Sequence, residues 1–455
     1  MPNPERPPHV RRAAQPEQTS GLGAGQLDAL VIVLDEVRSG RAGTRPELIA
    51  RTGLSRAVVT QRVGELVSRG LLEEAEIGVS TGGRAPRILR FRAEVGHVLV
   101  ADLGASSTAV AVADLSGRLI DHHEEPSDIV AGPAVVLGRV EELFDELLAR
   151  NALPGSRLWG IGIGVPGPVE FEAGRPIAPP IMPGWDGFRL RELFTERHDV
   201  PVWVDNDVNV MALGEVQAGI ARDHDVVVLV KLGTGIGAGV VIGGRLVRGA
   251  QGCAGDVGHI HVTDDPSVVC RCGKIGCLEA LAGAGAIGSR AEQIARDGRS
   301  RFLREVLETN GKITAADVAR AANHGDAPAL ELINQAGRLV GGMLATVVNL
   351  LNPSLIVIGG GFARSGDALL AAIRQTIYAR SLPLATRELL VQRSVLDETG
   401  GLIGAAAMVV DELFAPRTLA AWLEHGHPGG RPQLAGTAPD ATRLVPGMIR
   451  PFTEK

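Results

Sequence analysis

Three of the four cysteines in this 455-residue chain lie within eight residues of one another, just downstream of two histidines. The segment reads GDVGHIHVTDDPSVVCRCGKIGCLE from position 255 to 279. Thiolates and an imidazole are ligands that tetrahedral Zn²⁺ prefers, and four protein ligands leave no position for a catalytic water. The spacing therefore predicts a structural zinc site. Its predicted ligands are Cys270, Cys272, Cys277 and either His259 or His261.

The fourth cysteine, Cys253, stands outside this cluster and is expected to be a small buried apolar residue. Thiols that only pack together are the alternative to a metal site, and the C-x-C-x4-C spacing beside a histidine fits a metal site better. Metal-binding thiols are typical of a reducing compartment. The chain has no apolar run that could span a bilayer, and its N-terminus is polar and proline-rich. We therefore expect a cytoplasmic protein with no membrane partner.

A glycine-rich loop, LGTGIGAG at 232–239, is the second feature that could do chemistry. Glycines let the backbone come close to an anion, so this loop can present N–H groups to a phosphate. Around it, near-continuous apolar runs alternate with segments of helical periodicity, which indicates an α/β architecture. The predicted helices lie near 133–150, 283–296, 327–350 and 366–380.

Two strings in this part of the chain are weakly alike: DLGASSTAVAVADLSGRL from 102 and KLGTGIGAGVVIGGRL from 231. Each joins an LG turn to a strand and then to a GRL hairpin, which indicates an internal duplication. Two such lobes resemble the actin, hexokinase and heat-shock ATPase superfamily, with its ribonuclease H-like fold. That resemblance implies a cleft between the lobes, shared by nucleotide and substrate.

The first part of the chain has a different pattern. Apolar residues at helical spacing and capping signals predict three short helices before Gly70, with a tight turn at Gly53 between the second and third. The strand-like segment at 71–91 adds a hairpin, so residues 26–92 are predicted to form a winged helix-turn-helix. The third helix would enter the major groove, and the wing tip would reach the minor groove or the phosphates. The predicted DNA-contacting residues are Ser55, Arg56, Thr60, Gln61 and Arg84.

A winged helix used for protein contact is the alternative. DNA binding is favoured because polar residues gather at the reading end of the third helix. The chain carries a net charge of −6, whereas 26–92 holds eleven arginines against eight carboxylates. This asymmetry is compatible with a basic DNA-binding unit attached to an acidic ligand-binding unit. Paired half-sites in operator DNA predict a homodimer or tetramer. Residues 1–25 are expected to be a disordered arm and 414–455 a partly disordered extension.

The pattern GH, ten residues, CxCGxxGCxE closely resembles the signature of the ROK family, whose members are sugar kinases and sugar-responsive repressors. The resemblance covers residues 97–413 and implies that His259 is the zinc ligand. It also makes Asp207 the position of the kinase's catalytic base. The sugar-binding positions that it implies are Asn206, Asp207, Asp256, His259 and Glu279. The implied phosphate-loop positions are Asp102, Gly104, Gly233, Thr234 and Gly235.

Departures from the family pattern decide between a sugar kinase and a sugar-responsive repressor. The kinases' DxGGTK loop reads Asp102–Ser107 here, with Ala105 for a glycine and Ser107 for the lysine, so phosphate handling should suffer. Asp256 also stands where the family has Glu. With a DNA reader attached, the hypothesis is a repressor of carbohydrate genes, controlled by a sugar or sugar phosphate and without enzyme activity. An ATP-dependent, glucokinase-like sugar kinase with an appended DNA-binding module is the alternative, because Asp207 is retained.

Overall fold

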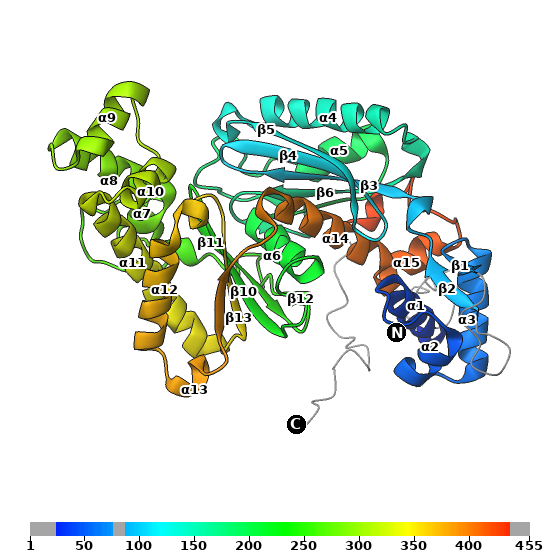
Figure 1. The fold of residues 1–455 in the computed structure, drawn as a ribbon. Helices are drawn as coiled ribbons and strands as arrows, with labels where there is room; N and C mark the ends of the chain where they lie inside the picture. Colours follow the sequence, from blue (N-terminus) through cyan, green and yellow to red (C-terminus); the bar gives the residue numbers. More distant parts are fainter. Residues whose placement is uncertain (1–23, 76–86, 437–455) are drawn as a thin grey trace, which may run out of the picture.

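The computed structural model describes residues 24–75 and 87–436, which form a winged helix and two α/β lobes. In Figure 1 the winged helix lies against lobe I at the right, and lobe II lies at the left. Within the described residues, every helix is too short or too polar to cross a membrane.

The winged helix follows the local signals closely. Thr44 caps the second helix by accepting a hydrogen bond from the Glu47 N–H, and Gly53 ends that helix with a φ of 67°. Ser55 caps the third helix by accepting from the Val58 N–H at 3.3 Å. The wing tip at 76–86, with Arg84, lies outside the described residues. The elements are α1 (Ala24–Arg38), α2 (Arg45–Thr52), α3 (Arg56–Ser68) and the antiparallel β1 (Leu72–Ala75) and β2 (Ile88–Phe91).

Lobe I is built on a five-stranded sheet in the order β5-β4-β3-β6-β9. Its strands alternate apolar side chains between two faces, one covered by α4 and α5 and the other by α14. The strands are β3 (His97–Leu103), β4 (Ser107–Asp114), β5 (Leu119–Pro126), β6 (Leu158–Val165) and β9 (Val202–Asn206), with a small hairpin of β7 (Val169–Glu170) and β8 (Arg175–Pro176). The helices are α4 (Pro133–Arg150), α5 (Leu190–His198) and α14 (Gly400–Phe414).

Lobe II repeats this topology, with the order β12-β11-β10-β13-β14 and the same sequence of antiparallel and parallel pairings. The predicted duplication is therefore confirmed. Its strands are β10 (Val226–Leu232), β11 (Ile236–Ile242), β12 (Arg245–Leu246), β13 (Leu355–Gly359) and β14 (Leu390–Arg393). Its helices are α6 (Asp207–Gln217), α7 (Glu279–Ala282), α8 (Ala284–Arg296), α9 (Arg301–Asn310), α10 (Ala315–Asn323), α11 (Ala327–Leu351), α12 (Asp367–Arg380) and α13 (Pro383–Thr386).

Helices α6 and α14 lie side by side between the two sheets (Figure 1). Glycines make this contact close: a Cβ on Gly404 would lie 1.6 Å from the Val210 carbonyl oxygen, and one on Gly214 would lie 2.1 Å from that of Gly400. Any larger side chain would force the helices apart. The contact therefore ties α6, which begins at the cleft, to α14.

The predicted partly disordered C-terminal extension, 414–455, is described as far as residue 436. Residues after Phe414 form α15 (Pro416–Leu423) and continue, packed, to residue 436, with Leu434 buried. Trp422 is fully buried and donates a hydrogen bond from its indole to the Leu413 carbonyl at 2.9 Å. Trp422 therefore anchors the described part of this segment.

An aromatic seam of Phe91, Trp159, Phe414 and Trp422 joins the winged helix to lobe I. The Phe414 ring lies 5.7 Å from Phe91 of β2 and 5.8 Å from Trp422, and Trp159 of β6 lies 5.2 Å from Trp422. All four are buried in one apolar cluster that runs from α1 to α15. The winged helix thus shares its core with lobe I.

Candidate ligand cleft, metal centre and DNA-reading surface

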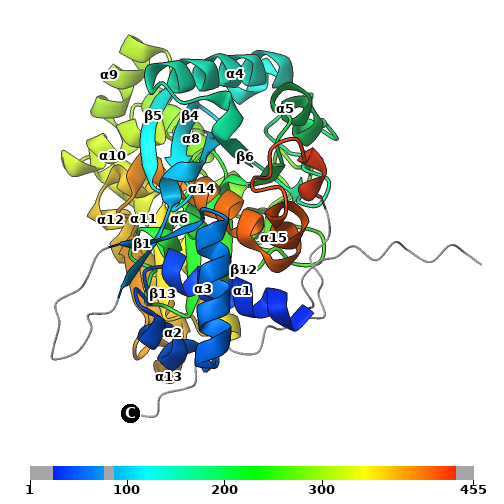
Figure 2. The ribbon, with the colours of Figure 1, turned by 90° about the vertical axis from the view of Figure 1, so that its right-hand side faces the viewer.

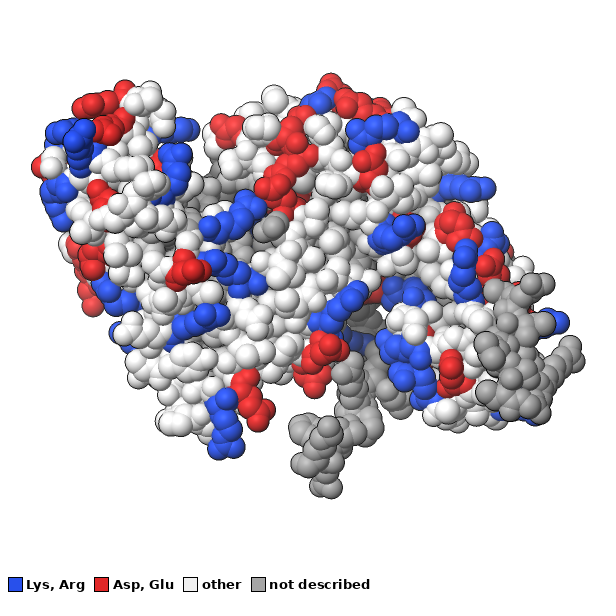
Figure 3. All heavy atoms as spheres, viewed as in Figure 1, with Lys and Arg blue, Asp and Glu red and all other residues white. Residues whose placement is uncertain are grey.

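A cavity of about 750 Å³ opens between the lobes, where Figure 3 shows the surface hollowed. Both lobes contribute to its wall, so a ligand in it would contact each of them. Nine of the ten residues predicted to bind sugar or phosphate line it: Gly104, Asn206, Asp207, Gly233, Thr234, Gly235, Asp256, His259 and Glu279.

Asp207 lies at the start of α6, directly after β9. Asn206 caps this helix, accepting from the Val208 N–H at 2.9 Å and donating to the Gly167 carbonyl at 2.9 Å. Asp207 Oδ1 accepts from the same Val208 N–H at 3.0 Å, and its Oδ2 pairs with Lys231 Nζ at 2.6 Å. Each oxygen of the kinase-base position therefore already accepts one hydrogen bond.

Lys231 was missed in the sequence analysis, although a lysine inside an apolar strand next to a glycine loop is a readable signal. It lies on β10 in lobe II and lines the cavity. Burial would lower the pKa of Lys231, but the carboxylates of Asp207 and Asp102 outweigh burial and raise it. The ammonium therefore stays charged and pairs β10 with the first residue of α6.

Asp102, the remaining predicted phosphate-loop residue, does not line the cavity. Its carboxylate sits behind the loop, where only glycines fit: a Cβ on Gly401 would lie 1.9 Å from Oδ2 and one on Gly164 would lie 3.2 Å from Oδ1. Oδ1 is enclosed and has no hydrogen-bond partner among the described residues. Burial, opposed by Lys231 and assisted by Asp207, raises the pKa of Asp102 to about 6.

Asp256 and Glu279 are held in place on the other side of the cleft. Glu279 Oε2 accepts from the Ile236 N–H at 3.1 Å. Asp256 follows Gly255, which has a φ of +94° and approaches Ala238 so closely that a Cβ would lie 1.7 Å from its carbonyl oxygen. Only glycine can take that position, so the loop that carries Asp256 is fixed against β11.

A second pair missed by the sequence analysis supports this region. Asp205 is buried and pairs with Arg248 Nε at 2.7 Å and with Asn209 Nδ2 at 2.7 Å. The Arg248 guanidinium also lies 3.8 Å from the centre of the Phe171 ring. These contacts hold the chain after β12 against lobe I, ahead of the loop that carries Asp256.

The predicted cysteines and His259 come together in a cluster that could hold a metal ion, with all four ligand atoms within 4.8 Å of one another. Cys272 Sγ and Cys277 Sγ are 3.7 Å apart, close to the ligand spacing expected for a tetrahedron with Zn–S bonds of about 2.3 Å. His259 Nδ1 lies 3.6 Å from Cys270 Sγ, and its Nε2 lies 3.8 Å from Asp256 Oδ1. One imidazole can thus serve the cluster and orient a cleft residue.

His261 is not part of this cluster: its Nε2 pairs with Asp264 at 2.9 Å and its Nδ1 with the Ile275 carbonyl at 3.2 Å. The structure therefore selects His259 from the two histidines that the spacing allowed. Cys253 is exposed and lines the cavity, so the expectation that it is buried was wrong. It sits in the glycine-rich loop before Asp256, outside the hydrophobic core.

The predicted DNA-reading residues of α3 are all exposed. Ser55 is the N-cap of α3, and Arg56, Thr60 and Gln61 lie in the first half of this helix, which stands at the front of the molecule in Figure 2. Among the described arginines of the winged helix, Arg56 is the one without an ion pair. A free guanidinium at the reading end of α3 remains available to a base or a phosphate.

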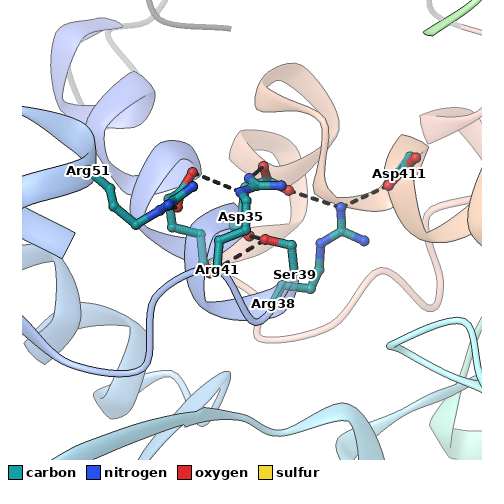
Figure 4. A network of polar contacts seen from close by, with 7 residues as sticks. Asp35, Arg38, Ser39, Arg41, Arg51 and Asp411 are labelled. Atoms are coloured by element: carbon teal, nitrogen blue, oxygen red, sulfur yellow. Dashed lines mark hydrogen bonds and ion pairs between the residues drawn. The ribbon is translucent and has the colours of Figure 1, made fainter. Parts of the chain in front are cut away.

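The other arginines of the winged helix that the structure describes are each paired with a carboxylate. Arg41 pairs with Asp35 at 2.5 Å, Arg51 pairs with Glu36 at 2.6 Å, and Arg38 reaches Asp411 of α14 at 2.8 Å (Figure 4). The surface there accordingly mixes both signs of charge (Figure 3). Most of these described arginines therefore form ion pairs within the winged helix, and Arg38 also forms one with lobe I.

Residues 98–412 match the ROK family over most of the chain. The chain belongs to the ROK family. It is 34% identical to a glucokinase of Halalkalibacterium halodurans over 68% of this chain and 93% of that protein. It is also 29% identical to a xylose repressor of Caldicellulosiruptor bescii over 85% of this chain and 96% of the repressor.

Another similar ROK relative is the DNA-binding transcriptional dual regulator NagC of Escherichia coli, 30% identical over 80% of this chain and 88% of NagC. A crystallised ROK family transcriptional regulator, homologous to the E. coli MLC protein, matches 88% of this chain and 99% of its own with a TM-score of 0.74. The ROK glucokinase of Streptomyces griseus, solved with glucose and AMPPNP, matches 69% of this chain with a TM-score of 0.61. The regulators, unlike the kinases, match beyond the family region and therefore into the winged helix.

Proposed function

We propose that this ROK protein is a DNA-binding transcriptional regulator, a repressor of carbohydrate genes, whose effector is a sugar or sugar phosphate bound between the lobes. The observation that carries the proposal is the winged helix, with its exposed reading end, fused through a common core to a kinase-like cleft. The similarity to a xylose repressor and to NagC supports it over that same span.

The cleft residues suit recognition more than catalysis. In a kinase Asp207 would have to take a proton from the attacking hydroxyl, and here one of its oxygens is paired with the Lys231 ammonium at 2.6 Å. Asp256 and Glu279 remain positioned to accept hydrogen bonds from sugar hydroxyls. The glucokinase similarity keeps residual sugar kinase activity as the second candidate.

The His259, Cys270, Cys272 and Cys277 cluster is proposed to hold a structural zinc ion. The ion would supply a fixed anchor for the loop, and the cluster offers no open position for chemistry. A bound ion would fix the imidazole of His259. The fixed imidazole would in turn orient Asp256, because its second nitrogen faces that carboxylate.

A homodimer on paired half-sites would convert ligand binding into a change of DNA affinity. The winged helix and lobe I share one core, so the ligand would act by moving lobe II against this combined body. A coupling of roughly 1–3 kcal/mol would change operator affinity by about five- to a hundredfold.

Selection of bound genomic fragments, followed by gel shifts with and without a panel of saccharides, tests the proposal. We expect a specific shift that one saccharide weakens or strengthens. Absence of a shift with any fragment would contradict the regulator assignment. Incubation with ATP and the same sugars tests the second candidate, and rapid turnover abolished by Asp207→Asn would favour a kinase.

A further inference from the structure

Lys231 occupies the space between the kinase-base position and the glycine loop. Its Nζ lies 2.6 Å from Asp207 Oδ2, and its Cε lies 3.9 Å from the point where a Cβ on Gly233 would be. The side chain is 21% exposed and forms part of the cavity wall. A phosphoryl group held against the Gly233–Gly235 loop would therefore lie next to the ammonium.

The ammonium has hydrogen-bonding capacity left over. It carries three N–H donors, and Asp207 is its acceptor among the described residues. The side chain is partly exposed to the cavity, so solvent can accept from the remaining donors when no ligand is bound. A ligand that brings acceptor oxygens to this point would satisfy the two remaining donors.

The ion pair with Lys231 removes one obstacle to an anion at this point. Asp207 alone would repel a negatively charged ligand, and its pairing with Lys231 cancels that repulsion. Two arginines, Arg320 and Arg364, also line the cavity, but their side chains are 60% and 51% exposed and pair with Asp317 and Glu398. Solvent screens such pairs, which leaves Lys231, with a side chain 21% exposed, as the least exposed of these three cations.

We propose that Lys231 is the specificity-determining residue of the cleft and selects a saccharide that carries a phosphoryl group, held by the ammonium beside the Gly233–Gly235 loop. The inference rests on the proposed function and narrows its effector class. Asp207 acts in this arrangement as the counter-ion that fixes the ammonium. Asp256 and Glu279, on the metal side of the cleft, are left to bind the hydroxyls.

Calorimetry on the full chain with matched ligands tests the inference. The pairs are glucose and glucose 6-phosphate, and N-acetylglucosamine and its 6-phosphate, with glucuronate, inorganic phosphate and ATP alone as further arms. We expect a phosphorylated sugar to bind more tightly than its neutral parent. Lys231→Met should weaken the phosphorylated ligand by roughly ten- to a hundredfold and the parent much less. Lys231→Arg should keep part of the preference, and Lys312→Met, at an exposed lysine outside the cavity wall, should keep all of it.

The ratio of the two dissociation constants separates recognition from a purely structural ion pair, which would not change it. If Lys231→Met fails to fold, the double variant Asp207→Asn/Lys231→Met, which removes both charges, should still lose the preference. Competition by inorganic phosphate in the wild type alone would support the contact. Lysine-dependent binding of glucuronate would extend the ligand class to carboxylates.

Two results would overturn the inference and leave the regulator standing: equal affinity for neutral and phosphorylated sugars in the wild type, or lysine-dependent binding of ATP with no saccharide. Absence of binding by every saccharide would contradict both the inference and the proposed effector. The gel shift with genomic fragments would still test independently whether the protein binds DNA.

Discussion

Arg38 of the winged helix donates a hydrogen bond to Asp411, 373 residues later in the chain, across 2.8 Å. Asp411 lies near the C-terminal end of α14, and Gly401 at the other end of the same helix abuts Asp102 behind the cleft. One helix of 15 residues, about 22 Å long, thus touches both the ligand-binding region and the DNA-binding unit. This helix is one direct physical connection between the two.

The seam should depend on its aromatic residues far more than on its ion pair. Phe414→Ala removes a buried ring that contacts Phe91 and Trp422, so we expect a loss of about 3–5 kcal/mol in the free energy of unfolding. Arg38→Ala should cost at most about 1 kcal/mol, because Asp411 is 60% exposed. Urea denaturation measures both, with Leu382→Ala at an exposed site as the control. Equal midpoints for Phe414→Ala and the control would show that the seam is not cooperative with lobe I.

Arg56→Ala should weaken operator binding without changing stability. The exposed guanidinium has no ion pair to lose within the described residues, and a base contact of this type contributes roughly 1–3 kcal/mol. Fluorescence anisotropy with a selected operator should show a rise in Kd of about five- to 150-fold. Arg301→Ala, on α9 of lobe II, serves as a matched control because that arginine is 85% exposed. Unchanged affinity of the Arg56 variant would place the DNA contact elsewhere.

Removal of the metal should loosen the loop that holds Asp256. We expect about one zinc ion per chain by elemental analysis of the purified protein, lost in Cys272→Ser. Chelation or this substitution should lower the melting temperature and weaken saccharide binding, because His259 would no longer be fixed. Cys253→Ser, at the exposed cysteine outside the cluster, should retain the metal. Protein that contains no metal and binds sugar normally would refute the zinc assignment.

Asp102 should make stability fall as the pH rises. Its pKa in the folded protein is about 6, above its ordinary value of 3.8, so the folded state holds a proton that the unfolded state releases between these values. Asp102→Asn cannot ionise, so its stability relative to the wild type should increase by up to about 3 kcal/mol between pH 4 and pH 7. Denaturant titrations at both pH values measure this difference, and Glu388→Gln at an exposed carboxylate gives the baseline. A difference that does not depend on pH would show that Asp102 is ionised throughout.

Short-range patterns in the sequence were sufficient for much of the fold. The caps at Thr44 and Ser55 and the αL glycine at Gly53 each depend on residues within a few positions, so the winged helix could be predicted from them. The repeated LG-strand-GRL strings likewise predicted two equivalent sheets. Helix α14 was not predicted, because it is apolar nearly all round and gains its position from packing between the sheets.

The sequence by itself determined which chemical groups this protein possesses: a cysteine cluster with a nearby histidine, a glycine loop, carboxylates at the sugar-binding positions and a DNA-reading helix. Only the tertiary structure decided how these groups are used. It chose His259 over His261, placed Lys231 against Asp207 and paired the arginines of the winged helix with carboxylates. Spacing along a chain limits local geometry, whereas an ion pair between separate elements depends on how their apolar faces pack.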